Sequence, residues 1–210
     1  YTTLFRSRAQ EQLTSSAVAS MVTQGNIEAE AGEAKKKLKK LLGKLEFSED
    51  VISVINELGM RIYNEASDAD IVEFLGGALN KASYRMMVLY IVLFWEAPEK
   101  LGSIVKNKSE LLRKCGKSAK DQLAQLFGLE YVMAMMIPER MKEYPQILKV
   151  LYDEDVIDDE IIVGWYQQPA ASQKVLGITP EKGDDVRKIC EAFVDWLQEE
   201  EEETDEDEED

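Results

Sequence analysis

Two stretches near the C-terminal end of this 210-residue chain place carboxylates beside large apolar side chains. The first, residues 147–165, reads ILKVLYDEDVIDDEIIVGW, and the second, residues 186–210, reads VRKICEAFVDWLQEEEEETDEDEED. Clustered carboxylates create a strong negative potential, and aromatic side chains supply a large contact area. A surface of this kind suits a lysine-rich peptide that also carries apolar anchors, so we interpret the pair as a candidate binding surface.

The candidate contact residues are the aromatic and acidic side chains of both stretches. They are Tyr152, Asp153, Glu154, Asp155, Asp158, Asp159, Glu160, Trp165, Phe193, Trp196, Glu199, Glu200, Glu201, Glu202 and Glu203. A single acidic segment is often only a solvated face or a helix N-terminus stabilised by the macrodipole. The pattern recurs beside a second tryptophan, which favours binding. Helical spacing places Trp196 close to Ile189 and roughly 60° from Phe193, so we expect Trp196 to be mostly buried.

Several kinds of catalytic site are excluded by residue types that the chain lacks. The sequence has no histidine, so a Ser-His-Asp or Cys-His arrangement and a zinc site with histidine ligands are excluded. It has no glycine-rich phosphate loop, and the acids of 153–160 lack the alternating spacing of a calcium loop. Cys115 and Cys190 fall in helical patterns and are expected to be buried thiols. We therefore expect no cofactor and no metal.

The net charge of −16 is unevenly distributed along the chain. Residues 199–210 hold eleven of the 41 acidic residues and none of the 25 basic ones. Such a tail repels nucleic acid and membrane surfaces and favours basic partners. The longest apolar run, Met86–Trp95, is shorter than the roughly eighteen residues of a membrane span. We expect a cytoplasmic protein, and the start at Tyr1 predicts a fragment of a longer one.

A basic segment precedes the first acidic stretch. Residues 100–120 carry seven lysines and arginines against the single acid Glu110. The candidate second surface consists of Lys106, Lys108, Arg113, Lys114, Lys117 and Lys120. No aromatic residues lie among these bases, which weakens the case for stacking on single-stranded RNA. An acidic protein partner is the favoured interpretation, while direct RNA binding and a merely solvated face stay open.

The elements that must position these residues are predicted to be helices. From Ser48 onward apolar residues recur at helical spacing, and no run alternates as a strand does. We predict an all-α architecture of about seven to nine helices, arranged as a bundle or a helical-repeat stack. Expected helix starts are Ser67, Ser83, Ser109 and Ser118. Residues 84–95 are expected to form a central buried helix, and residues 167–183 a loop containing glycine and proline.

Three regions follow from these patterns. Residues 1–45 are predicted to be a linker or interdomain tether, partly helical, with a lysine cluster around Leu38. Residues 46–203 are predicted to form the folded domain. Residues 204–210 are predicted to be an acidic disordered tail.

The stretches YPQILKVLYDEDVIDDEIIVGWY and FVDWLQEEEEETDEDEED resemble the two aromatic/acidic boxes of a C-terminal domain shared by several translation factors. The family includes eukaryotic translation initiation factor five, the epsilon subunit of the exchange factor of initiation factor two, and the mimic proteins of factor five. Residues 121–141 are most similar to initiation factor five, and the resemblance covers residues 85–203. It implies a HEAT-like antiparallel stack of helix pairs, an α-solenoid. Gly164 and Gln198 depart from the family pattern without removing an aromatic or an acid.

The resemblance implies a non-enzymatic adaptor of translation initiation. Its boxes would bind a lysine-rich segment of the beta subunit of initiation factor two. Further partners would be initiation factors one and three and the scaffold subunit of the cap-binding complex. The GTPase-activating function of factor five would lie in a separate N-terminal domain, absent from this sequence. The alternatives are a nucleotide-exchange domain of the epsilon-subunit kind, a factor-five mimic regulator, and an RNA-binding module.

Overall fold

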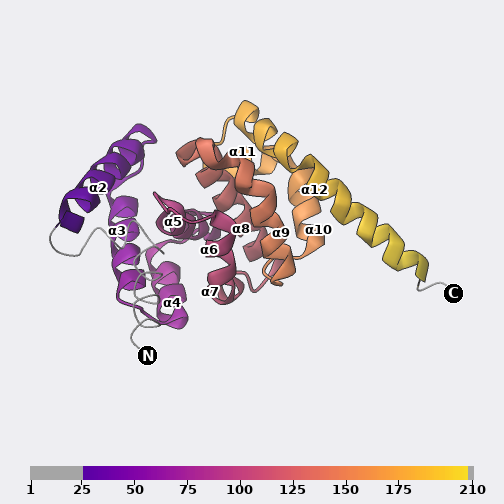
Figure 1. Ribbon diagram of the computed structural model, residues 1–210, viewed down its shortest axis with the longest axis horizontal. Helices are drawn as coiled ribbons and strands as arrows, with labels where there is room; N and C mark the ends of the chain where they lie inside the picture. The colour runs from indigo at the N-terminus through magenta and orange to yellow at the C-terminus, as the bar shows by residue number, and fades with distance from the viewer. Residues whose placement is uncertain (1–25, 208–210) are drawn as a thin grey trace.

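The computed structural model describes residues 26–207, which fold into eleven α-helices joined by short connections (Figure 1). The described residues contain no strand, so the all-α prediction is confirmed. The predicted number of seven to nine helices was too low. Residues 169–176 are helical where we expected a loop, and residues 26–44 are helical within the segment that we expected to be a partly helical tether.

The helices form a HEAT-like antiparallel stack. In chain order they are α2 (Asn26–Lys44), α3 (Glu49–Tyr63), α4 (Asp68–Ala78), α5 (Ala82–Phe94), α6 (Leu101–Asn107), α7 (Ser109–Cys115), α8 (Ala119–Tyr131), the π-helical turn η2 (Val132–Met136), the 3-10 helix η3 (Pro138–Glu143), α9 (Tyr144–Asp153), α10 (Asp159–Gln167), α11 (Pro169–Leu176) and α12 (Pro180–Asp207). Helices α2 to α4 lie at one end of the stack and α9 to α12 at the other, where α12 extends past the body (Figure 1).

Helix α5 lies at the centre of the core, as its continuous apolar run predicts. Every residue from Met86 to Phe94 is buried, and α8 packs along it. At the crossing, Gly128 of α8 faces the α5 backbone so closely that a Cβ atom there would lie 2.5 Å from the Met87 nitrogen. Only glycine allows the two backbones to approach this closely.

Gly128→Ala is therefore expected to destabilise the fold by about 1–3 kcal/mol, because the added methyl group must push α5 and α8 apart. Gly164→Ala is the matched control, since a Cβ atom at this helical glycine of α10 meets nothing within 4 Å. Alanine favours helix over glycine by about 1 kcal/mol, so the control should be neutral or stabilising. Urea denaturation followed by circular dichroism measures both, and equal stabilities for the two variants would contradict the close crossing.

Three of the four predicted helix starts are confirmed, and the one at Ser83 lies two residues past the observed N-cap of its helix, Lys81. The Ser67 hydroxyl accepts a hydrogen bond from the Asp70 amide at 3.2 Å, and the Ser118 hydroxyl accepts one from Asp121 at 3.3 Å. Ser109 is the first residue of α7, whereas Ser83 is the second residue of α5, and both serines are buried. Neither of those helices has a side-chain cap, so packing sets where they begin.

The predicted loop over residues 167–183 is wrong for a local reason. Pro169 is the first residue of α11, Gly177 follows its last residue with φ of 72°, and Pro180 begins α12. Proline suits the first turn of a helix, and a left-handed glycine is a common helix stop. The residues that we interpreted as loop signals are helix boundaries.

The two ends of the described chain also differ from expectation. Leu38 and Leu42 of α2 belong to the core, so part of the predicted tether packs on the folded body. The five neighbouring lysines, Lys35, Lys36, Lys37, Lys39 and Lys40, are exposed. Helix α12 continues to Asp207, so residues 204–207 of the predicted disordered tail are helical, as glutamate's helix propensity allows. Residues 1–25 and 208–210 lie outside the described part of the chain, and the division at residues 46 and 203 stays a prediction.

Both cysteines are free thiols within the helices. Burial raises the pKa of Cys190 to about 12 and that of the less enclosed Cys115 to about 11. A raised pKa leaves little thiolate near neutral pH, so both behave as packing residues, in agreement with the sequence. Among residues 26–207, no helix is both long and apolar enough to cross a membrane.

Candidate protein-interaction site

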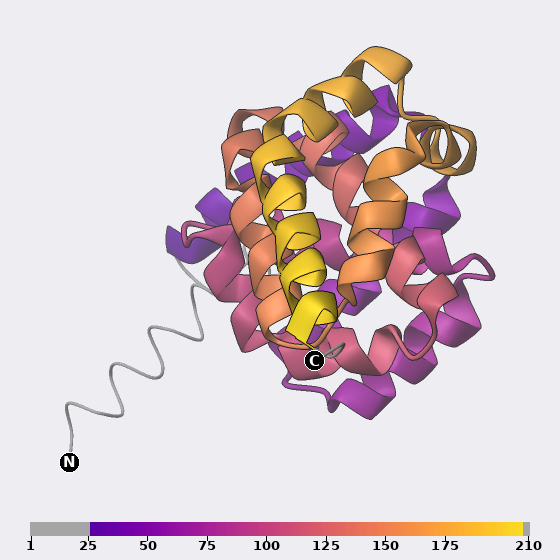
Figure 2. The ribbon, with the colours of Figure 1, turned by 90° about the vertical axis from the view of Figure 1, so that its right-hand side faces the viewer.

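Helix α12 brings the two aromatic/acidic stretches together by lying against both α9 and α10 (Figure 2). The Tyr152 ring, near the end of α9, meets Trp196 of α12 edge to face, with centroids 6.0 Å apart. Trp196 also stacks on Phe193, with centroids 5.7 Å apart. We call Tyr152, Phe193 and Trp196 the aromatic cluster. It joins residues far apart in sequence into one feature.

The helical spacing of α12 explains where this cluster lies. Val186, Cys190, Val194 and Leu197 form the buried inner stripe of the helix. The flanking row is more open than this stripe, because Ile189 is 36% exposed and both Phe193 and Trp196 are partly buried. These three residues fall at i, i+4 and i+7 and so share one side of the helix. Trp196 is therefore mostly covered, as expected, while part of its side chain remains accessible at the surface.

A lysine of α9 lies against the aromatic cluster. The ammonium group of Lys149 lies 4.8 Å from the centroid of the Trp196 ring, within the range of a cation–π contact. The same ammonium group lies 2.9 Å from a carboxylate oxygen of Asp153, one helical turn later. The aromatic cluster thus already holds one ammonium group from its own chain.

The acids of the first stretch line an open hollow beside the cluster. The hollow has a volume of about 370 Å³ and is lined by Tyr152, Asp155, Ile157, Asp158, Asp159 and Glu160. Among the residues whose side chains the structure describes, no ion pair involves any of those four acids. Asp158 is instead fixed by two hydrogen bonds with Gln122 of α8, each 3.0 Å long. The hollow therefore presents unbalanced negative charge to a cationic ligand.

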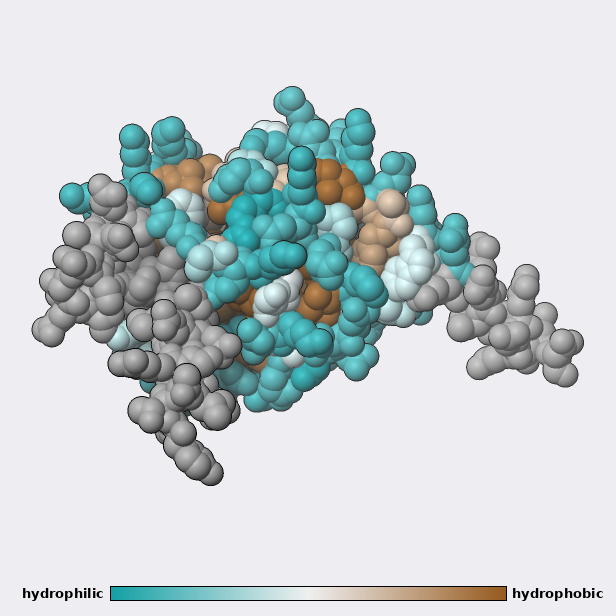
Figure 3. All heavy atoms as spheres, in the orientation of Figure 1, coloured by the Kyte–Doolittle hydropathy of each residue, from teal (hydrophilic) through white to brown (hydrophobic). Residues whose placement is uncertain are grey.

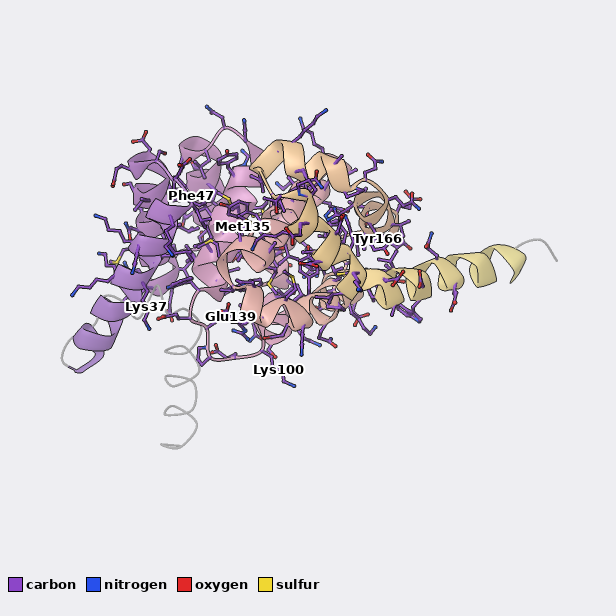
Figure 4. The ribbon with its side chains drawn as sticks, turned by 90° about the horizontal axis from the view of Figure 1, so that it is seen from above. Lys37, Phe47, Lys100, Met135, Glu139 and Tyr166 are labelled. Carbon is purple, nitrogen blue, oxygen red and sulfur yellow. The ribbon has the colours of Figure 1, made fainter. Side chains whose placement is uncertain are left out.

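The glutamate run of the second stretch continues from the aromatic cluster along α12. Glu199 is exposed three residues after Trp196, and Glu200–Glu203 follow in the same helix. Tyr166 of α10 lies near α12 (Figure 4). Neighbouring Glu191 and Asp195 contribute to a raised Tyr166 pKa, after the larger effect of burial. Negative charge thus surrounds the exposed part of α12.

Trp165 does not belong to this surface, although we included it among the candidate contact residues. It is 1% exposed, and its ring stacks on Tyr144 with centroids 5.7 Å apart. Its indole nitrogen donates a 2.8 Å hydrogen bond to the Glu130 carboxylate. Trp165 therefore supports the site from the core and cannot contact a partner directly.

A buried ion pair holds α12 in place, and the sequence analysis missed it. The Glu130 carboxylate of α8 accepts a 2.6 Å hydrogen bond from the Arg187 guanidinium of α12 and a 3.0 Å bond from the Ser172 hydroxyl of α11. Arg187 also lies 4.6 Å from the Trp165 ring centroid. A glutamate inside the inward-facing run LFGLEYV was the available signal, because a buried carboxylate requires a partner.

The predicted second, basic surface is partly neutralised and adjoins the first. Lys106 lies 3.3 Å from a carboxylate oxygen of Glu154, which belongs to the acidic stretch. Arg113 pairs with Glu110, and Lys114 pairs with both Glu110 and Asp68. Lys117 and Lys120 are exposed, whereas Lys108 is only partly so. The two candidate surfaces therefore meet along α6, α7 and the end of α9 and are not separate faces.

Comparison with known proteins shows what this part of the chain is similar to. Residues 121–207 match the family described as W2: eIF4-gamma/eIF5/eIF2-epsilon. Eukaryotic translation initiation factor 5 of Rattus norvegicus is 35% identical over 138 residues, which cover 66% of this chain and 30% of that protein. The corresponding protein of Zea mays is 36% identical over 98 residues, 45% of this chain and 19% of its own.

The fold agrees with a solved structure of the same group, the C-terminal domain of translation initiation factor 5 at low pH. The match has a TM-score of 0.56 and 25% sequence identity, and it covers 89% of this chain and 99% of the solved one. The chain spans less than a third of the length of the curated relatives above. The matched region includes α8 to α12 and both aromatic/acidic stretches. Residues 121–207 therefore match the W2 family of translation initiation factors, and the chain is similar in sequence and fold to the C-terminal domain of initiation factor 5.

Proposed function

We propose that the chain is a non-enzymatic adaptor that binds a lysine-rich segment of the beta subunit of initiation factor two. One observation carries the proposal: Tyr152 and Trp196 bring two acidic stretches together around an accessible aromatic cluster. The family relationship supports further contacts with initiation factors one and three and with the cap-binding scaffold subunit. Assembly of these factors would take place in the cytoplasm.

Two physical contributions to binding come together on the proposed surface, one electrostatic and one aromatic. Carboxylates on α9, α10 and α12 attract ammonium groups over a distance of about 10 Å at roughly 0.1 M salt. The aromatic cluster supplies contact area and cation–π attraction that depend less on salt. The hydrophilic face in Figure 3 has only scattered hydrophobic patches, so extended apolar docking is not the main term on that face.

Isothermal titration of the chain with the lysine-rich segment of the beta subunit tests the proposal. We expect saturable binding that weakens but does not vanish as salt is raised. Release of GDP from initiation factor two should be unchanged when the chain is added, since an adaptor does not catalyse exchange. Absence of binding would contradict the adaptor proposal, and accelerated GDP release would favour the exchange-domain alternative.

The exposed lysines between α7 and α8 and in the first turn of α8 carry a separate prediction. Lys117→Glu with Lys120→Glu should weaken binding of an acidic partner segment several-fold, because both side chains are exposed and neither has an ion pair among the described residues. Binding of the lysine-rich segment should be unchanged or slightly stronger. Titration with a glutamate-rich and a lysine-rich peptide measures both effects. If the folded variant no longer bound the lysine-rich peptide, the assignment of these two lysines to the surface for acidic partners would be contradicted.

A further inference from the structure

We infer that Lys149 occupies, in the free protein, the place that a lysine of the bound partner takes in the complex. This inference rests on the proposed function and names the subsite that would recognise one ammonium group. The subsite consists of the Trp196 ring and the Asp153 carboxylate, with Tyr152 and Phe193 packed around Trp196. Its ligand is a primary ammonium on a flexible aliphatic stem.

The geometry around Lys149 already shows how such a ligand is held. Its ammonium group lies 4.8 Å from the Trp196 ring centroid and 2.9 Å from the Asp153 carboxylate. A cation over the face of an indole, with a carboxylate at its side, satisfies both the charge and the hydrogen-bonding capacity of lysine. The contacts also join the first stretch to the second, since Lys149 and Asp153 come from α9 and Trp196 from α12.

The Lys149 side chain can move out of this subsite. The side chains of Lys149 and Asp153 are each 44% exposed, so water and an incoming group can reach both. Exposed ion pairs one helical turn apart contribute little to stability. Exposed side chains also change rotamer within nanoseconds. A partner lysine can therefore replace Lys149 without any change in the helices.

Lys149 then acts as an internal competitor that sets affinity and selectivity. A segment with one lysine must displace Lys149 and gains little from the exchange. A lysine-rich segment also fills the hollow lined by Asp155, Asp158, Asp159 and Glu160, whose carboxylates form no ion pair among the described side chains. Competition at the aromatic cluster therefore favours segments that carry several lysines.

The test compares Lys149→Met with Lys106→Met. Both variants remove one positive charge beside the acidic surface, and both release one carboxylate, Asp153 or Glu154. Of these two, only Lys149→Met removes the cation from the Trp196 ring. The probe is a synthetic peptide with several consecutive lysines, followed by titration calorimetry at low and high salt, with Lys149→Gln as a second variant.

We expect Lys149→Met to bind the peptide about two- to fivefold more tightly than Lys106→Met, the range of an exposed cation–π contact. The difference should persist at high salt, where the shared loss of charge matters less. Equal affinities for Lys149→Met, Lys149→Gln and Lys106→Met, with circular dichroism unchanged, would overturn the inference and leave the proposed function intact. Absence of binding by the unmodified chain and by every variant would overturn both.

Discussion

Replacing Glu130 by alanine is expected to lower the free energy of unfolding by about 3–5 kcal/mol, because it leaves the Arg187 guanidinium buried without its counter-ion. Glu130 is fully buried and accepts hydrogen bonds from Arg187, Ser172 and Trp165. A single substitution therefore removes the side-chain hydrogen bonds that link α8 to α10, α11 and α12. Urea denaturation of the chain, followed by circular dichroism, measures the change.

Two controls separate the buried charge from a general effect of losing an acid. Glu110→Ala removes an exposed partner of Arg113 and should change stability by no more than about 0.5 kcal/mol. The double variant Glu130→Met with Arg187→Met removes both buried charges and should recover much of the loss. A Glu130→Ala variant as stable as Glu110→Ala would contradict the assigned role of this ion pair.

Replacing Glu199–Glu203 by glutamine is expected to weaken binding of a lysine-rich peptide at low salt by about tenfold or more. Each exposed ion pair contributes about 0.2–1 kcal/mol, and five carboxylates act together on one ligand. The salt dependence of binding should flatten and association should slow, since exposed charges mainly steer encounter. Titration at several salt concentrations and stopped-flow association measure both quantities.

A matched control lies further along the same acidic run. Residues 206–210 also hold five acids, so replacing them by amides changes the net charge by the same amount, at a greater distance along the chain from Trp196. This variant should lose less affinity than the one at Glu199–Glu203. Equal losses would mean that the run acts only as a general negative charge rather than as part of the aromatic/acidic surface.

Much of the fold could be predicted because the relevant signals are local. Apolar residues at helical spacing mark α3, α8, α9 and α10, and a continuous apolar run marks the central helix α5. Ser67 and Ser118 cap their helices through residues three positions later, which lie within reach of sequence reasoning. The proline and glycine of residues 169–180 were also local signals, but helix boundaries and loops use the same residue types.

The parts of the site that escaped prediction depend on contacts between distant residues. Helical spacing identifies the inner stripe of α12, but only the packing of α9 and α10 decides that Ile189 and Trp196 stay accessible. In the sequence, Trp165 resembles Trp196 because both are aromatic residues close to acids. In the structure, Trp165 is buried and donates a hydrogen bond to Glu130. The sequence likewise suggests that Lys106 belongs to a separate basic surface. In the structure it pairs with Glu154, which lies 48 positions later in the chain.

The indole signals of the three tryptophans in a ¹H–¹⁵N spectrum test the central claim most directly. During titration with a lysine-rich peptide, we expect the Trp196 indole and the backbone amides of residues 152–160 to shift together, because both stretches form one surface. The indoles of Trp95 and Trp165 should stay in place, since both side chains are buried. Saturable binding that shifts residues of α2 to α4 and leaves Trp196 unchanged would contradict the paired aromatic/acidic surface.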